Sequence, residues 1–261
     1  MNQSDLECAA ALLAQSHHAL ALTGAGHSTP SGIPDFRSPG AGLWEQVDPM
    51  IVASAEGFRD NVEGFYDWLR PLAQKMVEAE PNAAHLALAE LEELGVIHAV
   101  ITQNIDRLHQ RAGSQRVLEL HGSVSQATCT GCGRKVAGEE MWPRVIAEGG
   151  VARCGACGAV LKPDVVLFGE PLPLDVLLDT QQECMQCDVM LIAGSSLEVY
   201  PAGGLPRYAL SHGAQLIIVN YQPTSMDRAA SVVIHDDVAT ALPALVERIR
   251  SMRGCQEHAT A

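Results

Sequence analysis

The chain has 261 residues, of which 47% are hydrophobic and only 4% aromatic, and its formal net charge is −14. This length suffices for one sizeable core, while the acidic balance disfavours nucleic-acid binding, which needs a basic surface to attract phosphates. No apolar run reaches the length of a membrane span, and the N-terminal segment has acidic residues but no early Lys or Arg. We therefore expect a cytoplasmic protein with no signal peptide, no nucleic-acid partner and no membrane partner.

Short apolar runs rich in Val, Ile and Leu alternate along the chain with longer helical patterns. Such runs are typical of strands that are buried on both faces of a parallel sheet. Strands are expected at residues 18–23, 98–102, 116–120, 165–168, 189–193, 215–219 and 231–235. Helices are expected before the first strand and at residues 83–94, 173–186, 201–211 and 237–252. This alternation predicts right-handed crossovers and an α/β fold with a Rossmann-like, doubly wound parallel sheet.

Two stretches interrupt the alternation. Residues 27–50 are dense in Gly, Pro and Ser and predict a long ordered loop, which in a compact domain is usually functional. Residues 124–162 contain two cysteine pairs and predict a small inserted module. The expected organisation is one discontinuous domain of residues 1–123 and 163–253, interrupted by the module at 124–162 and followed by a tail at 254–261.

The four cysteines of the module have the spacing of a zinc ribbon. Cys129 and Cys132 form one Cys-x-x-Cys pair, Cys154 and Cys157 form the other, and each pair is followed by Gly. Glycine allows the tight turn that points both sulfurs at one ion. Four thiolates leave no open coordination position, so the predicted zinc is structural. The third such pair, at residues 184 and 187, lacks these glycines and predicts core cysteines.

A glycine-rich loop follows the first predicted strand. Gly24, Ala25 and Gly26 suggest a loop that holds phosphate at a helix N-terminus, although position 29, where a dinucleotide fingerprint has its third Gly, is Thr. Glycines in an ordinary turn are the alternative. Ser28 and Arg37 favour the phosphate interpretation, because they supply a donor and a positive charge.

Several segments together resemble the sirtuin family. Residues 24–37, GAGHSTPSGIPDFR, closely resemble its cofactor-binding loop, and residues 102–106, TQNID, resemble its second motif. Leu-His-Gly at 120–122 precedes the cysteine pairs, as in that family, and further matches follow in order at 162–170, 194–201 and 218–220. The resemblance covers roughly residues 5–250. It implies an NAD-dependent protein lysine deacylase of bacterial or archaeal type, with NAD as co-substrate of the Rossmann-like domain and one structural Zn²⁺.

The resemblance also implies roles for individual residues. Asn104 and Asp106 are expected to orient the nicotinamide carboxamide, although Asn-Ile-Asp after a strand is also typical of a helix N-cap, and both roles can hold. His121 is expected to be the general base that deprotonates a ribose hydroxyl, since imidazole titrates near neutral pH. Phe36 is expected to cover the reacting sugar, and Gln103 to contact the ribose hydroxyls.

The implied cofactor contacts are Gly24, Ala25, Gly26, Ser28, Asp35, Phe36, Arg37, Gln103, Asn104, Asp106, Gly194, Ser195, Ser196 and Asn220. An acyl-lysine peptide is expected to lie extended along two segments, through Val166, Phe168, Gly169, Leu197, Val199 and Tyr200. His27 departs from the family, which usually has a small aliphatic residue there, and it receives no role.

The acyl preference is predicted from the helix that follows the cofactor loop. Sirtuins that prefer acidic acyl groups carry Tyr-x-x-Arg there, whereas Tyr66 is followed three residues later by Leu69, and Arg70 is offset by about 100° around the helix. Acetyl and other neutral acyl groups are therefore expected. The alternative functions are protein ADP-ribosyl transfer or NAD hydrolysis in the same pocket. A nucleic-acid-binding zinc ribbon is a third, which the acidic charge disfavours.

Overall fold

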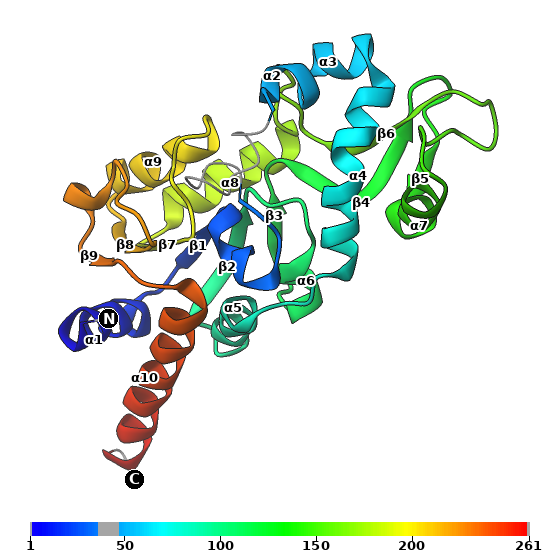
Figure 1. Ribbon diagram of the computed structural model, residues 1–261. Coiled ribbons are helices and arrows are strands. Elements are labelled where there is room, and N and C mark those ends of the chain that lie inside the picture. Colours follow the sequence, from blue (N-terminus) through cyan, green and yellow to red (C-terminus); the bar gives the residue numbers. More distant parts are fainter. Residues whose placement is uncertain (1, 36–46, 260–261) are drawn as a thin grey trace.

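A computed structural model describes residues 2–35 and 47–259, and within it six parallel strands form the main sheet (Figure 1). Their order is β3-β2-β1-β7-β8-β9. The strands are β1 (Ala19–Thr23), β2 (Ile97–Thr102), β3 (Val117–Glu119), β7 (Val189–Ala193), β8 (Gln215–Val219) and β9 (Val232–Ile234). The order runs outward from β1 in one direction and from β7 in the other, so the topological switch point lies between these two strands. The predicted doubly wound sheet is confirmed.

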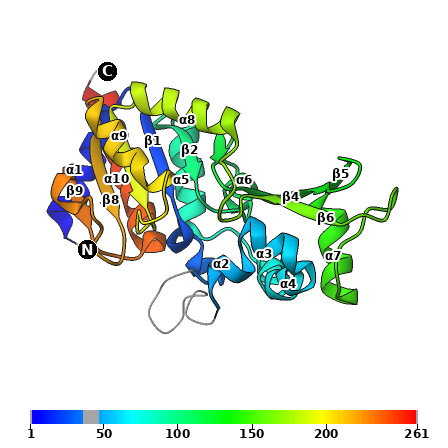
Figure 2. The same cartoon turned by 90° about the horizontal axis from the view of Figure 1, so that it is seen from above.

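Helices cover both faces of this sheet (Figures 1 and 2). The first face carries α1 (Gln3–Gln15), α5 (Ala83–Glu93) and α10 (Val238–Ala259), with the short α6 (Leu108–Ala112) beside α5. The opposite face carries α8 (Leu174–Gln186) and α9 (Leu205–Ser211). Alternate residues of β1 enter the two cores: Ala19 and Ala21 face the first group of helices, and Leu20 and Leu22 face the second.

The predicted helices are present, with shifted ends. Asn82 caps α5 by accepting a hydrogen bond from the Ala84 N–H at 2.8 Å, and Gly95 follows the helix with φ of +66°. The helix predicted at 201–211 begins as a 3₁₀ turn (Ala202–Gly204) before α9. Helix α10 continues into the segment predicted as a tail. No helix in residues 2–35 and 47–259 has both the length and the hydropathy to cross a membrane.

A second, three-stranded antiparallel sheet stands beside the main one (Figure 2). Its order is β5-β4-β6, with β4 (Gly122–Cys129), β5 (Lys135–Ala137) and β6 (Leu161–Val165), and it packs with α7 (Gly138–Glu148) and with α4 (Val62–Glu78). Short helices α2 (Pro49–Val52) and α3 (Ala55–Asp60) lead into α4. This sheet, α7 and helices α2 to α4 form what we call the small lobe. Its hydrophobic core is built mainly from two separate chain segments, residues 49–78 and 122–165. The predicted domain boundaries stay a prediction.

The strand predicted at residues 165–168 is wrong. Strand β6 ends at Val165 and pairs antiparallel with β4, outside the parallel sheet. Beyond it the chain makes only an isolated bridge between Phe168 and Ser54. The run is apolar because residues 165–168 line a cleft, described below, and not because helices cover both of its faces.

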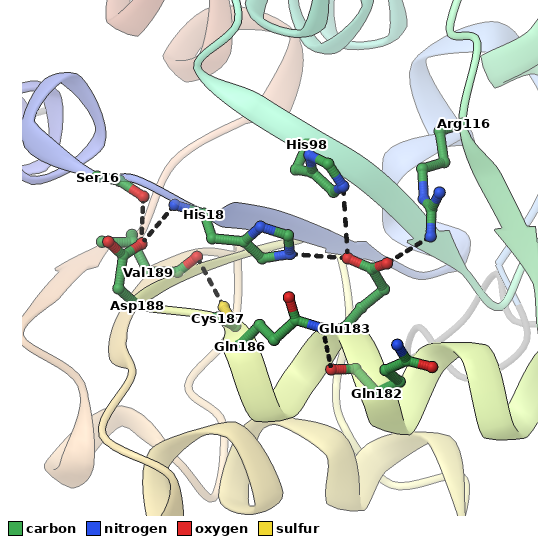
Figure 3. Close-up of polar contacts among 10 residues, drawn as sticks. All are labelled: Ser16, His18, His98, Arg116, Gln182, Glu183, Gln186, Cys187, Asp188 and Val189. Carbon is green, nitrogen blue, oxygen red and sulfur yellow. Dashed lines mark hydrogen bonds and ion pairs between the residues drawn. The ribbon is translucent and has the colours of Figure 1, made fainter.

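A buried carboxylate attaches α8 to the amino ends of the parallel strands (Figure 3). Glu183, 6% exposed, accepts a hydrogen bond from His18 Nε2 at 2.7 Å, lies 3.7 Å from His98 Nε2 and pairs with Arg116. These three partners come from the segments that begin or belong to β1, β2 and β3. Glu183 thus connects one helix to three adjacent strands.

Glu183→Gln should destabilise the fold by about 1–3 kcal/mol, because the charge that Arg116 and His18 share is lost inside the protein. Urea denaturation monitored by circular dichroism measures this. Asp179→Asn on the exposed side of α8 is the matched control and should change stability by less than about 0.5 kcal/mol. Equal stabilities of the two variants would contradict the role given to Glu183.

Candidate active site and zinc centre

A cleft of about 1440 Å³ lies at the carboxyl edge of the parallel sheet. Its walls come from the segments that follow all six parallel strands, and from α4 and residues 165–172. In a doubly wound fold, the switch point at this edge is where nucleotides bind. The predicted residues that line it are Gly24, Ala25, Gly26, Ser28, Asp35, Gln103, Asn104, Asp106, His121, Val166, Phe168, Gly169, Gly194, Ser195, Ser196, Val199, Tyr200 and Asn220.

Among the described residues predicted to contact the cofactor or the peptide, Leu197 is not in this lining. Leu197 has a side chain buried in the core below the cleft, where it packs with the α9 side of the sheet. Phe36 and Arg37 lie outside the described residues, so their roles stay predictions. The ligand contacts of all the other residues also stay predictions, although the fold brings them to one cleft.

Glycines allow the loops after β1 and β7 to touch. The Gly26 N–H donates to the Gly194 carbonyl at 2.9 Å. A Cβ on Gly24 would lie 2.9 Å from Ser195 Cβ, and a Cβ on Gly194, whose φ is +66°, would lie 2.3 Å from the His27 nitrogen. Side chains are therefore excluded here, and the backbone itself forms the floor of the cleft, as a phosphate-binding loop requires.

A hydrogen-bonded network fixes Asn104 and Asp106. The Ser28 hydroxyl donates to Asp106 Oδ2 at 2.6 Å and accepts from Asn104 Nδ2 at 3.0 Å, and Asn104 Nδ2 also donates to the Gly24 carbonyl at 3.0 Å. Asp106 Oδ1 accepts from the N–H of Leu108, the first residue of α6, at 2.9 Å. Burial raises the pKa of the Asp106 carboxyl, and the Ser28 and Leu108 hydrogen bonds oppose that shift. Asp106 therefore bonds to the first amide of α6 and also borders the cleft.

His121 has a defined orientation. Its Nδ1 lies 2.9 Å from the Gln103 carbonyl, an acceptor, so Nδ1 carries the proton in the neutral ring and Nε2 keeps its lone pair. Burial lowers the pKa of His121, while the bond to Gln103 partly restores it. On the other side, Gln103 Nε2 donates to Ser195 Oγ at 3.0 Å. Gln103 thus connects the His121 imidazole to the loop after β7.

A cluster of three buried histidines, which we call the histidine cluster, lies behind this network and consists of His27, His85 and His109. Burial, followed by the neighbouring His85, lowers the pKa of His109 to about 3, and burial lowers the pKa of His85 to about 4. Burial and then His109 hold the pKa of His27 well below its ordinary value. Sequence reasoning missed the cluster, because its members are far apart in the chain. The one signal in the sequence was His27 itself, which stands where the sirtuin motif usually has a small aliphatic residue.

The four predicted zinc ligands converge. Cys129 Sγ lies 3.4 Å from Cys157 Sγ, Cys132 Sγ lies 3.8 Å from Cys154 Sγ, and all four sulfurs lie within 4.8 Å of one another. A tetrahedral zinc with Zn–S bonds of about 2.3 Å places its sulfurs about 3.8 Å apart. The N–H groups of Cys132 and then Gly131 donate to Cys129 Sγ and lower the pKa of that thiol to about 6. The four cysteines therefore fit one structural zinc.

Cys154→Ser should lose this zinc and loosen the small sheet, since the metal supplies folding free energy that the short strands cannot replace. Atomic absorption gives the metal content, and thermal unfolding gives the stability. Cys8→Ser, at an exposed cysteine, should leave both unchanged. A metal-free Cys154→Ser protein with the stability of the unaltered chain would refute a structural zinc.

The fold, the glycine-lined cleft and the zinc centre define a Rossmann-like nucleotide-binding protein with a zinc-bearing lobe. A model of the Sir2 family matches residues 24–201. The chain is 46% identical over 252 residues to NAD-dependent protein deacylase 2 of Archaeoglobus fulgidus, covering 96% of this chain and 98% of that protein. It is 45% identical over 250 residues to NAD-dependent protein deacetylase 1 of Pyrobaculum aerophilum, covering 95% and 96%.

Solved structures agree with these relatives. One Sir2 enzyme structure superposes with a TM-score of 0.89 at 45% identity, covering 96% of this chain and all of that one. A Sir2 structure with a p53 peptide and NAD⁺ superposes with a TM-score of 0.82 at 40% identity, covering 94% and 97%. The chain belongs to the Sir2 family, the sirtuins.

Proposed function

We propose that the protein is an NAD-dependent protein lysine deacylase. The observation that carries this proposal is the convergence of the sirtuin motif residues from five strand ends on one cleft. Relatives over nearly the whole chain are named as deacylases or deacetylases, and one related Sir2 structure holds a deacetylated p53 peptide with 3′-O-acetyl ADP-ribose. A cytoplasmic location and the absence of nucleic-acid partners remain predictions from composition.

The dinucleotide is proposed to lie across the switch point. The glycine floor would receive its phosphates, and Gly194, Ser195, Ser196 and Asn220 would hold the adenosine end. Ser28 orients Asn104 and Asp106, so that Asn104 Oδ1 and the Asp106 carboxylate can accept hydrogen bonds from the N–H groups of a carboxamide. When bound, NAD supplies the ribose that accepts the acyl group.

His121 is proposed as the general base. The Gln103 carbonyl holds the Nδ1 proton, so the Nε2 lone pair is available to take a proton from a ribose hydroxyl. Because the lowered pKa keeps the ring neutral at pH 7, no proton has to leave before catalysis. The base form is present above the folded-state pKa and is lost as the pH falls through it.

We expect the acidic limb of the kcat/KM profile to have its midpoint below pH 6.5, the ordinary histidine value. His121→Ala should reduce deacylation by about a thousandfold or more while NAD still binds, as isothermal titration would show. His212→Ala, at an exposed histidine, is the control and should change neither quantity. Unchanged turnover in His121→Ala would remove this residue from the mechanism.

The peptide is proposed to lie extended between residues 166–170 and 197–200, of which 166–170 and 198–200 border the same cleft. Main-chain pairing along such a groove tolerates varied side chains, so we expect weak sequence selectivity. The Val166 N–H donates to the His121 carbonyl at 2.8 Å, which ties this proposed peptide wall directly to the proposed base.

The walls near α4 favour neutral acyl groups. Phe65, Trp68, Leu69, Leu72 and Met76 line the cleft, and all but Trp68 are buried.

The two residues of α4 that could recognise an acid are engaged elsewhere. Tyr66 is buried and donates its hydroxyl to the Leu161 carbonyl at 2.5 Å. Arg70 bonds to Asp67 at 3.0 Å and to the Gly150 carbonyl at 3.2 Å, and neither Tyr66 nor Arg70 is part of the cleft lining. The described lining of the cleft includes no Lys or Arg, so a succinyl carboxylate would be desolvated there without a cationic partner.

We expect kcat/KM for an acetyl-lysine peptide to exceed that for the succinyl peptide by about a hundredfold or more, equivalent to about 3 kcal/mol of desolvation. Steady-state assays on acyl peptides of one sequence, with product masses recorded, test this. O-acyl-ADP-ribose formed in step with nicotinamide supports deacylation. ADP-ribosylated protein, or nicotinamide release without acyl-peptide, would instead indicate ADP-ribosyl transfer or NAD hydrolysis.

A further inference from the structure

The histidine cluster brings three imidazoles into direct contact inside the protein. His27 follows β1, His85 belongs to α5 and His109 belongs to α6, and each is at most 1% exposed. The ring centroid of His27 lies 4.7 Å from that of His85 and 5.0 Å from that of His109. The centroids of His85 and His109 lie 4.9 Å apart. One nitrogen of each ring lies within 4.8 Å of the other two.

Several of these nitrogens lack hydrogen bonds. Among the described residues, Nδ1 of His109 and both ring nitrogens of His27 make no hydrogen bond of normal geometry, although the Ala84 backbone lies near enough to the His27 ring to raise its pKa slightly against burial. An unsatisfied buried polar group costs about 1–3 kcal/mol, so proteins seldom retain several together without a ligand. The backbone of His27 is fixed, because Asn82 Nδ2 donates to its carbonyl at 2.9 Å and its nitrogen packs on Gly194, and the side chain is fully buried.

We propose that the histidine cluster is a second metal site, which takes one divalent transition-metal ion such as Zn²⁺ or Ni²⁺ through one nitrogen of each ring. Neutral imidazole is the preferred nitrogen ligand of these ions. Metal–nitrogen bonds of about 2.1 Å in a tetrahedral site place the nitrogens about 3.4 Å apart, so the rings need to close by about an ångström. This inference goes beyond the deacylase function and does not depend on it.

The surrounding bonds leave the required lone pairs available. Thr23 Oγ1 donates to Thr102 and lies 2.9 Å from His109 Nε2, so Nε2 carries the His109 proton and Nδ1 is free to bind a metal. The contacts of His85 are long, at 3.3 Å from the Asn82 nitrogen to Nδ1 and 3.5 Å from Ser28 Oγ to Nε2. The lone pair of His85 is on Nδ1, which accepts the Asn82 N–H of the α5 capping box, so metal binding through Nδ1 replaces that long bond.

The other histidine group suits a cation less well. His18, His98 and Glu183 also place three ligand atoms together, but the Arg116 guanidinium already pairs with that carboxylate and would repel a metal ion (Figure 3). His98 is also exposed. The Glu183 group therefore provides a matched control for the histidine cluster.

The test counts metal ions per chain and needs neither NAD nor a peptide, so its result is separate from that of the deacylase assay. Protein is refolded with excess Zn²⁺, dialysed and analysed by plasma mass spectrometry. The unaltered chain should retain one zinc more than His27→Ile, which replaces the imidazole by an aliphatic side chain of similar size. His109→Gln should lose the same ion, and His98→Gln should keep it.

Ni²⁺ titration of protein that carries zinc at the four cysteines only gives the affinity of the histidine cluster, which should fall by about a hundredfold or more in His27→Ile and stay unchanged in His98→Gln. X-ray absorption should show nitrogen, and not sulfur, around the added nickel. Equal metal content in the unaltered chain and in folded His27→Ile or His109→Gln overturns the proposal. Loss of the ion in His98→Gln, or sulfur ligation of nickel, overturns it as well.

Discussion

The backbone contact between the loops after β1 and β7 is the constraint on which the cleft depends. Gly26 bonds to Gly194, and a side chain on either glycine would collide with the opposite loop. This contact places Ser28 and Ser195 at fixed positions on the two halves of the sheet, and Gln103 then reaches Ser195 from β2. The loops after β1 and β7 thus approach more closely than side chains would permit, and this approach sets the relative positions of the motif residues in the cleft.

The small lobe also shapes the cleft, although its four cysteines lie outside the lining. Helix α4 lines the cleft with one face and packs on the small sheet with another. Tyr66 bonds to the Leu161 carbonyl at the start of β6, and the Trp142 indole N–H donates to the Val124 carbonyl at 2.8 Å. The four cysteines hold the far end of the same sheet. A structural metal can therefore influence acyl recognition through the rigidity of the wall that it supports.

The sequence predicted the parallel strands and the zinc ligands well, because each follows from a local pattern: buried apolar runs in one case, and fixed spacing with glycines in the other. The strand at 165–168 was wrong because apolar side chains that line a cleft resemble those of a buried strand. Helices α2 and α3 were missed because a short helix has too few turns to show a periodicity. The histidine cluster could not be predicted, since residues 27, 85 and 109 meet only when α5 and α6 pack below the first loop.

The two edge strands of the parallel sheet are shorter than its inner strands. The outer strands β3 and β9 have three residues each, whereas the inner strands have five or six. A strand of three residues offers few unpaired amide groups to a neighbouring molecule. Growth of the sheet from one copy of the protein into another is therefore disfavoured by the shortness of its two edge strands.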